Sequence, residues 1–410
     1  MKHVWVLNHY AQEPGDAGGT RHFHLAQHLP KFGWQASIVA ASVDHFSGRQ
    51  RLSPGELGRL EFVDSVPFLW VNVPRYVGNG ARRVKNMIAY ALRVCATRVL
   101  SPLPKPDILV GSSVHPLAAL AAAILARRHR VPFVFEVRDL WPQTLIDLGR
   151  LKKNSIATWI LRKLELWLYR EAAKIIVLLP RAWEYIVPLG IPRQKLVWIP
   201  NGVDLSLFPK PHAATTGDEF TLMYFGAHGN ANGLDNILLA MRQLYTMPNA
   251  QHIRLRMIGD GPMKPYLLAQ ALSLGLQNVT FEPPVPKCKI PSVAMEADAF
   301  VFNLVDAAVF RYGISSNKLF DYMAAMRPVI IASDASNNPI ADAQAGVTVG
   351  PGDPGALANA IFQMSKLPLE DRQRMGVAGR DYVEQNHSFE LLAERLANTL
   401  DSVCRNTDER

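Results

Sequence analysis

The stretch Tyr312-Gly-Ile-Ser-Ser-Asn-Lys-Leu-Phe-Asp-Tyr-Met-Ala-Ala-Met326 runs into Arg327-Pro328 and the apolar Val329-Ile-Ile331. This pattern predicts a loop, a short helix and a buried strand. Ser315 or Ser316 is the expected N-cap, because a short side-chain oxygen accepts a hydrogen bond from the free amides of the first helical turn. Pro328 prevents the helix from continuing.

The start of this helix is a candidate anion site. Unpaired N–H groups and the positive end of the helix dipole suit a phosphate there. Lys318 adds a cation, and Asp321, one turn later, suits a sugar hydroxyl. We interpret the segment as a nucleotide-sugar site. The alternative is an ordinary capped helix in which Lys318 and Asp321 form a surface i,i+3 pair worth about 0.2–0.5 kcal/mol.

Length and composition predict a globular protein of two domains. The chain has 410 residues, of which 49% are hydrophobic and 19% charged, and one hydrophobic core rarely grows to that size. The net charge of +9 predicts an anionic partner, for which nucleic acid, membrane lipid and a phosphorylated substrate all qualify.

Cysteine usage and the N-terminus predict a cytoplasmic setting. Cys95, Cys288 and Cys404 are odd in number and far apart, which argues against a disulfide framework or a metal cluster. No secretory signal is evident at the N-terminus. The longest apolar run, 117–126, falls short of the roughly 18 residues that a bilayer span needs.

Apolar strands alternate with helical segments along the whole chain, which predicts doubly wound parallel α/β sheets. We expect strands at 4–7, 36–41, 68–73, 107–111, 133–137, 174–179 and 196–199, and again at 220–225, 253–258, 279–282, 299–304 and 329–332. The polar, proline-rich segment between the two series is the expected linker. We therefore place one domain at 1–204, a linker at 205–219, a second domain at 220–385 and a closing C-terminal helix at 386–410.

Ligands of such sheets bind at the carboxyl ends of the strands. In the first domain these ends carry three polar groups: His9-Tyr10, Ser112-Ser-Val-His115 and Glu136-Val-Arg-Asp-Leu-Trp-Pro142. A lone histidine at a strand end is more often structural, but a shared edge favours a site. Gly18-Gly19 heads the first helix and lets a backbone approach a ligand, with Arg21 placed to reach an anion. The alternative for the glycine pair is a simple turn.

Residues 66–105 combine Trp70 and Tyr76 with a basic amphipathic segment that includes Arg82, Arg83 and Lys85. Such a segment is expected to lie on an anionic membrane surface, with the two aromatic residues at the interface. The alternative is an ordinary crossover helix with a solvated basic face. Nucleic acid is the less favoured anion, because the basic and aromatic array of an RNA-binding sheet is missing from the sequence.

Several motifs, taken in order, resemble those of the retaining GT-B glycosyltransferases of the family 4 type. They are Gly18-Gly19, Ile199-Pro-Asn-Gly-Val-Asp204, Ile258-Gly-Asp-Gly-Pro262, Ala297-Asp298 and Ser316-Asn-Lys-Leu-Phe-Asp-Tyr-Met-Ala324 with Arg327-Pro-Val-Ile330. The segments Glu136–Pro142 and Tyr312–Ser315 are most similar to the N-acetylfucosamine transferases of bacterial O-antigen and capsule assembly. The resemblance implies two Rossmann-like domains facing across a cleft.

The resemblance also implies a metal-independent site for a nucleoside-diphosphate sugar, with UDP as the expected nucleotide and without a bound cofactor. Asp321 would bind the ribose hydroxyls, and Lys318 with the amides of Ser315, Ser316 and Asn317 would bind the diphosphate. Gly226 at a strand end and the Gly18-Gly19 loop would border the diphosphate, and Pro284 and Val285 would lie beside the base. Asp139 or His115 would act on the acceptor side.

Three departures from the family pattern bear on this site. Gly313 stands where the first of two acids, eight positions apart, is common, and Asp321 stands at the second. Asn232 stands where a lysine is common before Gly233, so Arg311, Lys287 or Lys289 is expected to substitute. Met326 replaces a helix-ending glycine, at a cost of about 1 kcal/mol if its backbone is left-handed.

The expected function is retaining transfer of a sugar to a polyprenyl-diphosphate-linked glycan at the cytoplasmic membrane face, in surface polysaccharide biosynthesis. The sugar is expected to be an N-acetylated hexosamine or deoxyhexosamine such as N-acetylfucosamine. Only one acid is well placed, whereas a retaining glycosidase needs two. The alternatives are a nucleotide-sugar 2-epimerase or soluble-acceptor transferase of the same fold, and a non-catalytic nucleotide-sugar-binding protein.

Overall fold

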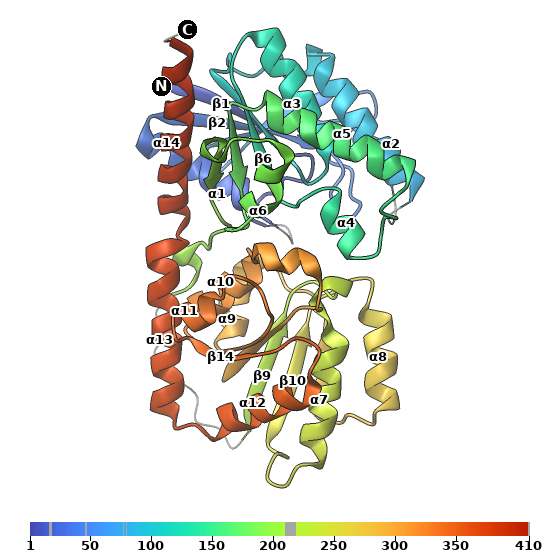
Figure 1. Ribbon diagram of the computed structural model, residues 1–410, viewed down its shortest axis with the longest axis vertical. Coiled ribbons are helices and arrows are strands. Elements are labelled where there is room, and N and C mark those ends of the chain that lie inside the picture. Colours follow the sequence, from blue (N-terminus) through green and yellow to red (C-terminus); the bar gives the residue numbers. More distant parts are fainter. Residues whose placement is uncertain (16–18, 46, 77, 79, 210–218, 409–410) are drawn as a thin grey trace. The chain divides into compact units, whose positions relative to one another are not determined.

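The computed structural model describes residues 1–15, 19–45, 47–76, 78, 80–209 and 219–408. The chain forms two compact units, each with a mainly parallel sheet between helices (Figure 1). Unit 1 comprises residues 1–201 and 389–410, and unit 2 comprises residues 202–388. The division falls three residues before the expected end of the first domain at 204. Most of the expected linker, 205–219, lies outside the described residues.

Unit 1 holds an eight-stranded sheet in the order β3-β4-β2-β1-β5-β6-β7-β8. Its strands are β1 (Lys2–Leu7), β2 (Trp34–Ala41), β3 (Gly58–Val63), β4 (Val66–Val71), β5 (Ile108–Ser112), β6 (Phe133–Val137), β7 (Lys174–Val177) and β8 (Leu196–Trp198). The sequence did not predict β3, which pairs antiparallel with β4. Asp64 and Ser65 form the two-residue hairpin turn between them with positive φ, a conformation that glycine and asparagine usually mark.

The helices of unit 1 are α1 (Arg21–His28), α2 (Ala81–Cys95), α3 (Pro116–His129), α4 (Gln143–Asp147), α5 (Ile156–Glu171), α6 (Trp183–Ile186) and α14 (Phe389–Asp408). The last of these, α14, is the expected closing helix. It packs on α1 and buries Leu392, Leu396 and Leu400 in the core of unit 1. The C-terminal segment therefore completes the first unit, although it follows the second in sequence.

Unit 2 holds a six-stranded parallel sheet in the order β11-β10-β9-β12-β13-β14. Its strands are β9 (Phe220–Phe225), β10 (Ile253–Ile258), β11 (Val279–Glu282), β12 (Ala299–Asn303), β13 (Val329–Ala332) and β14 (Gly346–Val349). Its helices are α7 (Leu234–Thr246), α8 (Lys264–Ser273), α9 (Ile290–Ala294), α10 (Asn317–Ala324), α11 (Pro339–Asp342), α12 (Pro354–Lys366) and α13 (Leu369–Asn386). The five strands expected here are all present, and β14 is a further strand that the sequence did not predict.

The ends of α10 confirm one expectation and correct another. Ser316 is the N-cap by position, but its side chain makes no capping hydrogen bond. Met326 has a φ of 58°, so the left-handed backbone that the family pattern implied is present, at about 1 kcal/mol for a residue with a side chain. Gly376 of α13 lies against this bend, and a Cβ there would be 2.1 Å from the Met326 carbonyl oxygen.

Among the helices that the structure describes, none is long and apolar enough to cross a lipid bilayer.

Candidate functional site

Helix α10 is anchored to the carboxyl end of β9 by Tyr322. The Tyr322 hydroxyl donates to the Phe225 carbonyl at 2.8 Å and accepts from the Phe225 amide at 3.1 Å. The rings of Tyr322 and Phe300 stack with centroids 4.4 Å apart. The loop before α10 is held by the side-chain amide of Asn337. Its oxygen accepts a hydrogen bond from the Ile314 N–H at 2.7 Å, and its nitrogen donates to the Ile314 carbonyl at 3.0 Å. Asn337 was not predicted as a site residue, because its partner is recognisable only once the chain is folded.

Lys318 occupies the first turn of α10, as predicted, and is half-buried. Its ammonium group donates to the Tyr224 hydroxyl at 2.8 Å and to the Asn232 side-chain oxygen. The same group lies 4.7 Å from the centre of the Tyr224 ring and 5.3 Å from that of Phe302. Burial lowers the pKa of Lys318 to about 7, so near neutral pH this group is poised to take up a proton when an anion arrives.

The surface-pair alternative for Lys318 and Asp321 is wrong, because each has a different partner. The buried Asp321 carboxylate pairs with the ammonium group of Lys287. Burial raises the pKa of Asp321, and Lys287 acts in the opposite direction. Pro284 and Val285 precede Lys287 by three and two residues, so this ion pair brings the segment expected beside the base to α10.

The cation that contacts Asn232 is not one of the three that were expected to replace the missing lysine. The cation that contacts Asn232 is Lys318 itself, and not Arg311, Lys287 or Lys289. Asn303 of β12 supports the loop from below, because its side-chain amide donates to the carbonyls of Asn232 at 3.0 Å and Gly233 at 2.8 Å. Lys318 therefore contacts this loop, which contains no lysine of its own.

Gly226 lies at the end of β9 directly beside Lys318. Its φ is 144°, and a Cβ there would be 2.9 Å from Cδ of Lys318. Two residues on, His228 is fully buried, and neither of its ring nitrogens has a hydrogen-bond partner among the described residues. Burial lowers the pKa of His228 to about 4, so its imidazole is neutral at pH 7. His228 was not among the predicted site residues.

In unit 1 the sheet order places the ends of β1, β5 and β6 side by side, as expected. The His9 ring lies 4.7 Å from that of His115, and the Tyr10 ring lies 5.6 Å from it. The Nε2 atom of His9 bonds the side-chain oxygen of Asn86, on α2, at 2.7 Å. Topology therefore joins the first two predicted polar groups into one aromatic cluster.

The two predicted acceptor-side residues differ sharply in environment. His115 is 1% exposed, and within the described residues its ring nitrogens have no hydrogen-bond partner. Burial lowers the pKa of His115 to about 3, with a smaller contribution from Arg83, so the ring is neutral. Asp139, in the turn after β6, is exposed. The geometry thus leaves Asp139 accessible to solvent, and His115 as a neutral imidazole beneath the strand ends.

Arg21 does not have the predicted role, because it is an interior residue. It is 1% exposed and donates to the Glu136 carboxylate at 2.9 Å and to the carbonyls of Ile199 and Pro200. Burial alone would raise the pKa of Glu136, but His22 and Arg21 hold that pKa well below its usual value. The prediction that Arg21 reaches a ligand anion is wrong. Gly19 lies just before α1, and Gly18 lies outside the described residues.

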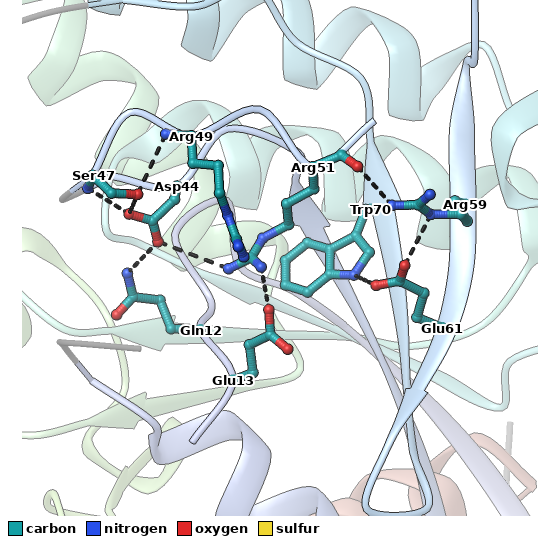
Figure 2. A network of polar contacts seen from close by, with 9 residues as sticks. All are labelled: Gln12, Glu13, Asp44, Ser47, Arg49, Arg51, Arg59, Glu61 and Trp70. Atoms are coloured by element: carbon teal, nitrogen blue, oxygen red, sulfur yellow. Dashed lines mark hydrogen bonds and ion pairs between the residues drawn. The ribbon is translucent and has the colours of Figure 1, made fainter. Parts of the chain in front are cut away.

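A second polar network holds the loop between β2 and β3 (Figure 2). Arg51 pairs with Glu13, lies 3.8 Å from an Asp44 oxygen, and covers the Trp70 ring at 4.3 Å. The Trp70 indole donates to Glu61 at 2.7 Å. Trp70 is fully buried and Tyr76 is 7% exposed. The prediction that these two aromatic residues lie at a membrane interface is therefore wrong.

Two protein-family models match the chain in succession. A glycosyl transferase 4-like domain matches residues 17–202, and a glycosyl transferases group 1 domain matches residues 219–366. The protein is a glycosyltransferase. The probable glycosyltransferase WbjE of Pseudomonas aeruginosa is 24% identical to this glycosyltransferase over 315 residues, which cover 74% of this chain and 76% of WbjE.

Solved structures show that the glycosyltransferase has the GT-B fold. Sucrose-phosphate synthase of Thermosynechococcus elongatus matches with a TM-score of 0.77 and 16% identity, over 99% of this chain and 100% of that one. HepE of Anabaena, in complex with UDP and glucose, matches with a TM-score of 0.66 and 15% identity, over 98% and 100%. The two Rossmann-like units described above are the two domains of this fold.

Proposed function

We propose that this glycosyltransferase binds a UDP-sugar at the start of α10 and transfers the sugar with retention of configuration. The observation that carries the proposal is the pairing of a helix N-terminus with the ammonium group of Lys318. Amides of the first helical turn and an adjacent cation stabilise the negative charge of a departing diphosphate without a metal ion. The UDP bound to HepE, a protein of the same fold, supports this choice of nucleotide.

The neighbouring residues take complementary roles in the proposal. Asp321 accepts hydrogen bonds from the ribose hydroxyls, and the amides of Ser315, Ser316 and Asn317 face the diphosphate. Gly226 leaves room for the phosphates beside Lys318, since a side chain there would meet the lysine. Pro284 and Val285 lie beside the base.

Transfer proceeds by attack of an acceptor hydroxyl on the anomeric carbon. The new bond forms between that carbon and the acceptor oxygen while its bond to the β-phosphate oxygen breaks. The acceptor proton passes to the departing phosphate oxygen on the same face, so no enzyme carboxylate has to act as the nucleophile. Gly313 in place of an acid agrees with such a route, and Asp139 orients the acceptor.

The acceptor in this proposal is a polyprenyl-diphosphate-linked glycan, and the product enters surface polysaccharide biosynthesis. The transferred sugar is an N-acetylated hexosamine or deoxyhexosamine such as N-acetylfucosamine, as the resemblance of Glu136–Pro142 and Tyr312–Ser315 implies. Residues 66–105 bring the enzyme to an anionic membrane surface through the basic side chains of α2.

The test is to replace Lys318 and Asp321 separately by alanine and to measure transfer from UDP-sugars to a lipid-linked acceptor. Each variant should lose transfer while its melting temperature stays close to that of the wild type. Asp235→Asn and Lys366→Met, which change charges elsewhere in unit 2, serve as matched controls and should retain activity. Wild-type transfer in either alanine variant contradicts the proposal. UDP binding without turnover of any donor and acceptor would instead favour a binding protein.

A further inference from the structure

The first turns of α5 expose an apolar stripe to solvent. Ile156 is 80% exposed, Trp159 63% and Ile160 52%. Their spacing of three and four residues puts all three side chains on one face of the helix. We call these three residues the α5 stripe. Soluble monomeric proteins rarely expose contiguous apolar patches, and such patches usually mark interaction sites. The α5 stripe therefore indicates a surface that binds a partner.

The rim of the α5 stripe is positively charged. Lys152, Lys153, Arg162 and Lys163 are exposed around it, and the Lys163 ammonium group lies 5.9 Å from the centre of the Trp159 ring. Between residues 150 and 170 the sequence contains one acid, Glu165. That carboxylate is buried and accepts hydrogen bonds from Tyr169 and Tyr185, so it adds no negative charge to the rim.

Helix α2 presents a second stripe of the same character. Val84, Ile88 and Leu92 are 51%, 46% and 67% exposed at successive intervals of four residues. Arg82 and Lys85 are exposed beside them, and α2 contains no acidic residue. Helix α3, which also has no acid, packs between α2 and α5 (Figure 1). The two stripes therefore belong to one helical layer on one side of the unit 1 sheet.

We propose that the outer surface of α2 and α5 docks on an anionic lipid bilayer, with the α5 stripe inserted at the headgroup boundary. This inference rests on the proposed function, which includes an anionic membrane surface as partner. It makes that partner contact more specific, because it assigns the apolar contact to α5, which lies outside residues 66–105. Exposed lysines around an apolar stripe fit anionic headgroups, and their stems extend along the acyl boundary. Trp159 supplies the interfacial aromatic residue that the buried Trp70 cannot supply.

A second copy of this chain fits the same surface less well. Two identical copies would bring two basic rims together, and the chain already carries a net charge of +9. A bilayer that contains phosphatidylglycerol supplies both the apolar phase and the opposite charge. The observations therefore favour lipid over self-association.

The experiment measures binding of the full-length protein to vesicles, with no donor or acceptor present. Vesicles of phosphatidylethanolamine with phosphatidylglycerol should bind the wild type, and vesicles of phosphatidylcholine should bind it at least about tenfold more weakly, because they lack the anionic attraction. The double variant Ile156→Glu/Ile160→Glu should lose at least about tenfold in binding to the anionic vesicles. Leu272→Glu is the matched control, since Leu272 is 84% exposed on α8 of unit 2, and it should bind like the wild type.

Quenching of tryptophan fluorescence shows which part of the protein contacts the bilayer. Brominated acyl chains should quench part of the fluorescence of the bound protein, and Trp159→Phe should remove that part. Wild-type vesicle binding by the double variant overturns the proposal, as does a failure of the wild type to bind anionic vesicles. A dimer in solution that the double variant abolishes also overturns it. None of these measurements uses turnover, and transfer to a short water-soluble acceptor tests the proposed function separately.

Discussion

The ammonium group of Lys318 lies 2.8 Å from the hydroxyl of Tyr224, and the same hydroxyl donates to the Ala227 carbonyl at 2.7 Å. Tyr224 thus connects the first turn of α10 to the loop that follows β9. A lysine side chain that keeps free rotamers in the unbound protein loses them on binding a ligand. By holding Lys318 in place beforehand, Tyr224 reduces that entropic cost.

Tyr224→Phe should weaken UDP binding by about tenfold, because a hydrogen bond to a charged group contributes about 1.5 kcal/mol. The phenyl ring keeps the contact below the ammonium group, so the change isolates the hydroxyl. Titration calorimetry with UDP measures the effect. Tyr245→Phe, at a partly exposed position on α7, is the control and should leave the affinity unchanged. Equal affinities of the Tyr224 variant and the wild type would show that Tyr224 does not position Lys318.

Lys318 should take up a proton when UDP binds at about pH 8, since its pKa of about 7 in the free protein rises beside a diphosphate. Calorimetry in two buffers of different ionisation enthalpy counts the protons, and we expect uptake approaching one per UDP. Lys318→Arg should show none, because guanidinium stays charged. Proton uptake that persists in the arginine variant would assign the proton to another group.

The lowered pKa of Lys318 also affects the stability of the free protein. The unfolded lysine keeps its proton up to about pH 10.4, whereas the folded one releases it from about pH 7. The unfolded state therefore binds more protons in this window, and the contribution of Lys318 to the free energy of unfolding rises with pH there. Urea denaturation at a series of pH values measures the free energy of unfolding. In Lys318→Met this free energy should lack the rise with pH that Lys318 contributes.

Lys287→Met should make UDP binding more sensitive to acid. Burial raises the pKa of Asp321, and Lys287 counteracts that rise, so loss of the lysine raises the pKa further. The protonated carboxyl accepts hydrogen bonds from ribose poorly, and the affinity for UDP should therefore begin to fall at a higher pH than in the wild type. Affinities measured from about pH 5 to pH 8 test this. Lys287→Arg should restore the wild-type profile, and tighter binding by the methionine variant at every pH would mean that Lys287 blocks the site.

Arg21→Met should destabilise unit 1 by about 3–5 kcal/mol, because it leaves the buried Glu136 carboxylate without its permanent counter-charge. Urea denaturation measures the loss. The double variant Arg21→Met/Glu136→Gln should recover much of it, since no unpaired buried charge remains. A single variant with wild-type stability but weakened UDP binding would restore Arg21 as a ligand contact.

Features of this protein that depend on neighbouring residues were predictable, and features that depend on distant residues were not. Five of the six described strands of unit 2 were predictable because a buried parallel strand is a continuous apolar run between polar turns. The sixth, β14, was not predicted, because it is only partly buried. The strand β3 was missed because it is half-exposed and its hairpin turn has a sequence that rarely marks one. The position of Lys318 at a helix start was predictable for the same local reason, from the pattern between Tyr312 and Pro328.

Two Rossmann-like domains, and the place of Lys318 and Asp321 on a short helix after β12, were predictable from sequence, since hydrophobic period and capping residues act over a few positions. The partners of these side chains, in contrast, depend on the tertiary fold. Tyr224 and Asn232 are 94 and 86 residues from Lys318, and Glu136 is 115 residues from Arg21. Sheet topology brings such residues together. Burial then decides whether a long polar side chain is available to a ligand or is paired with other groups in the protein interior.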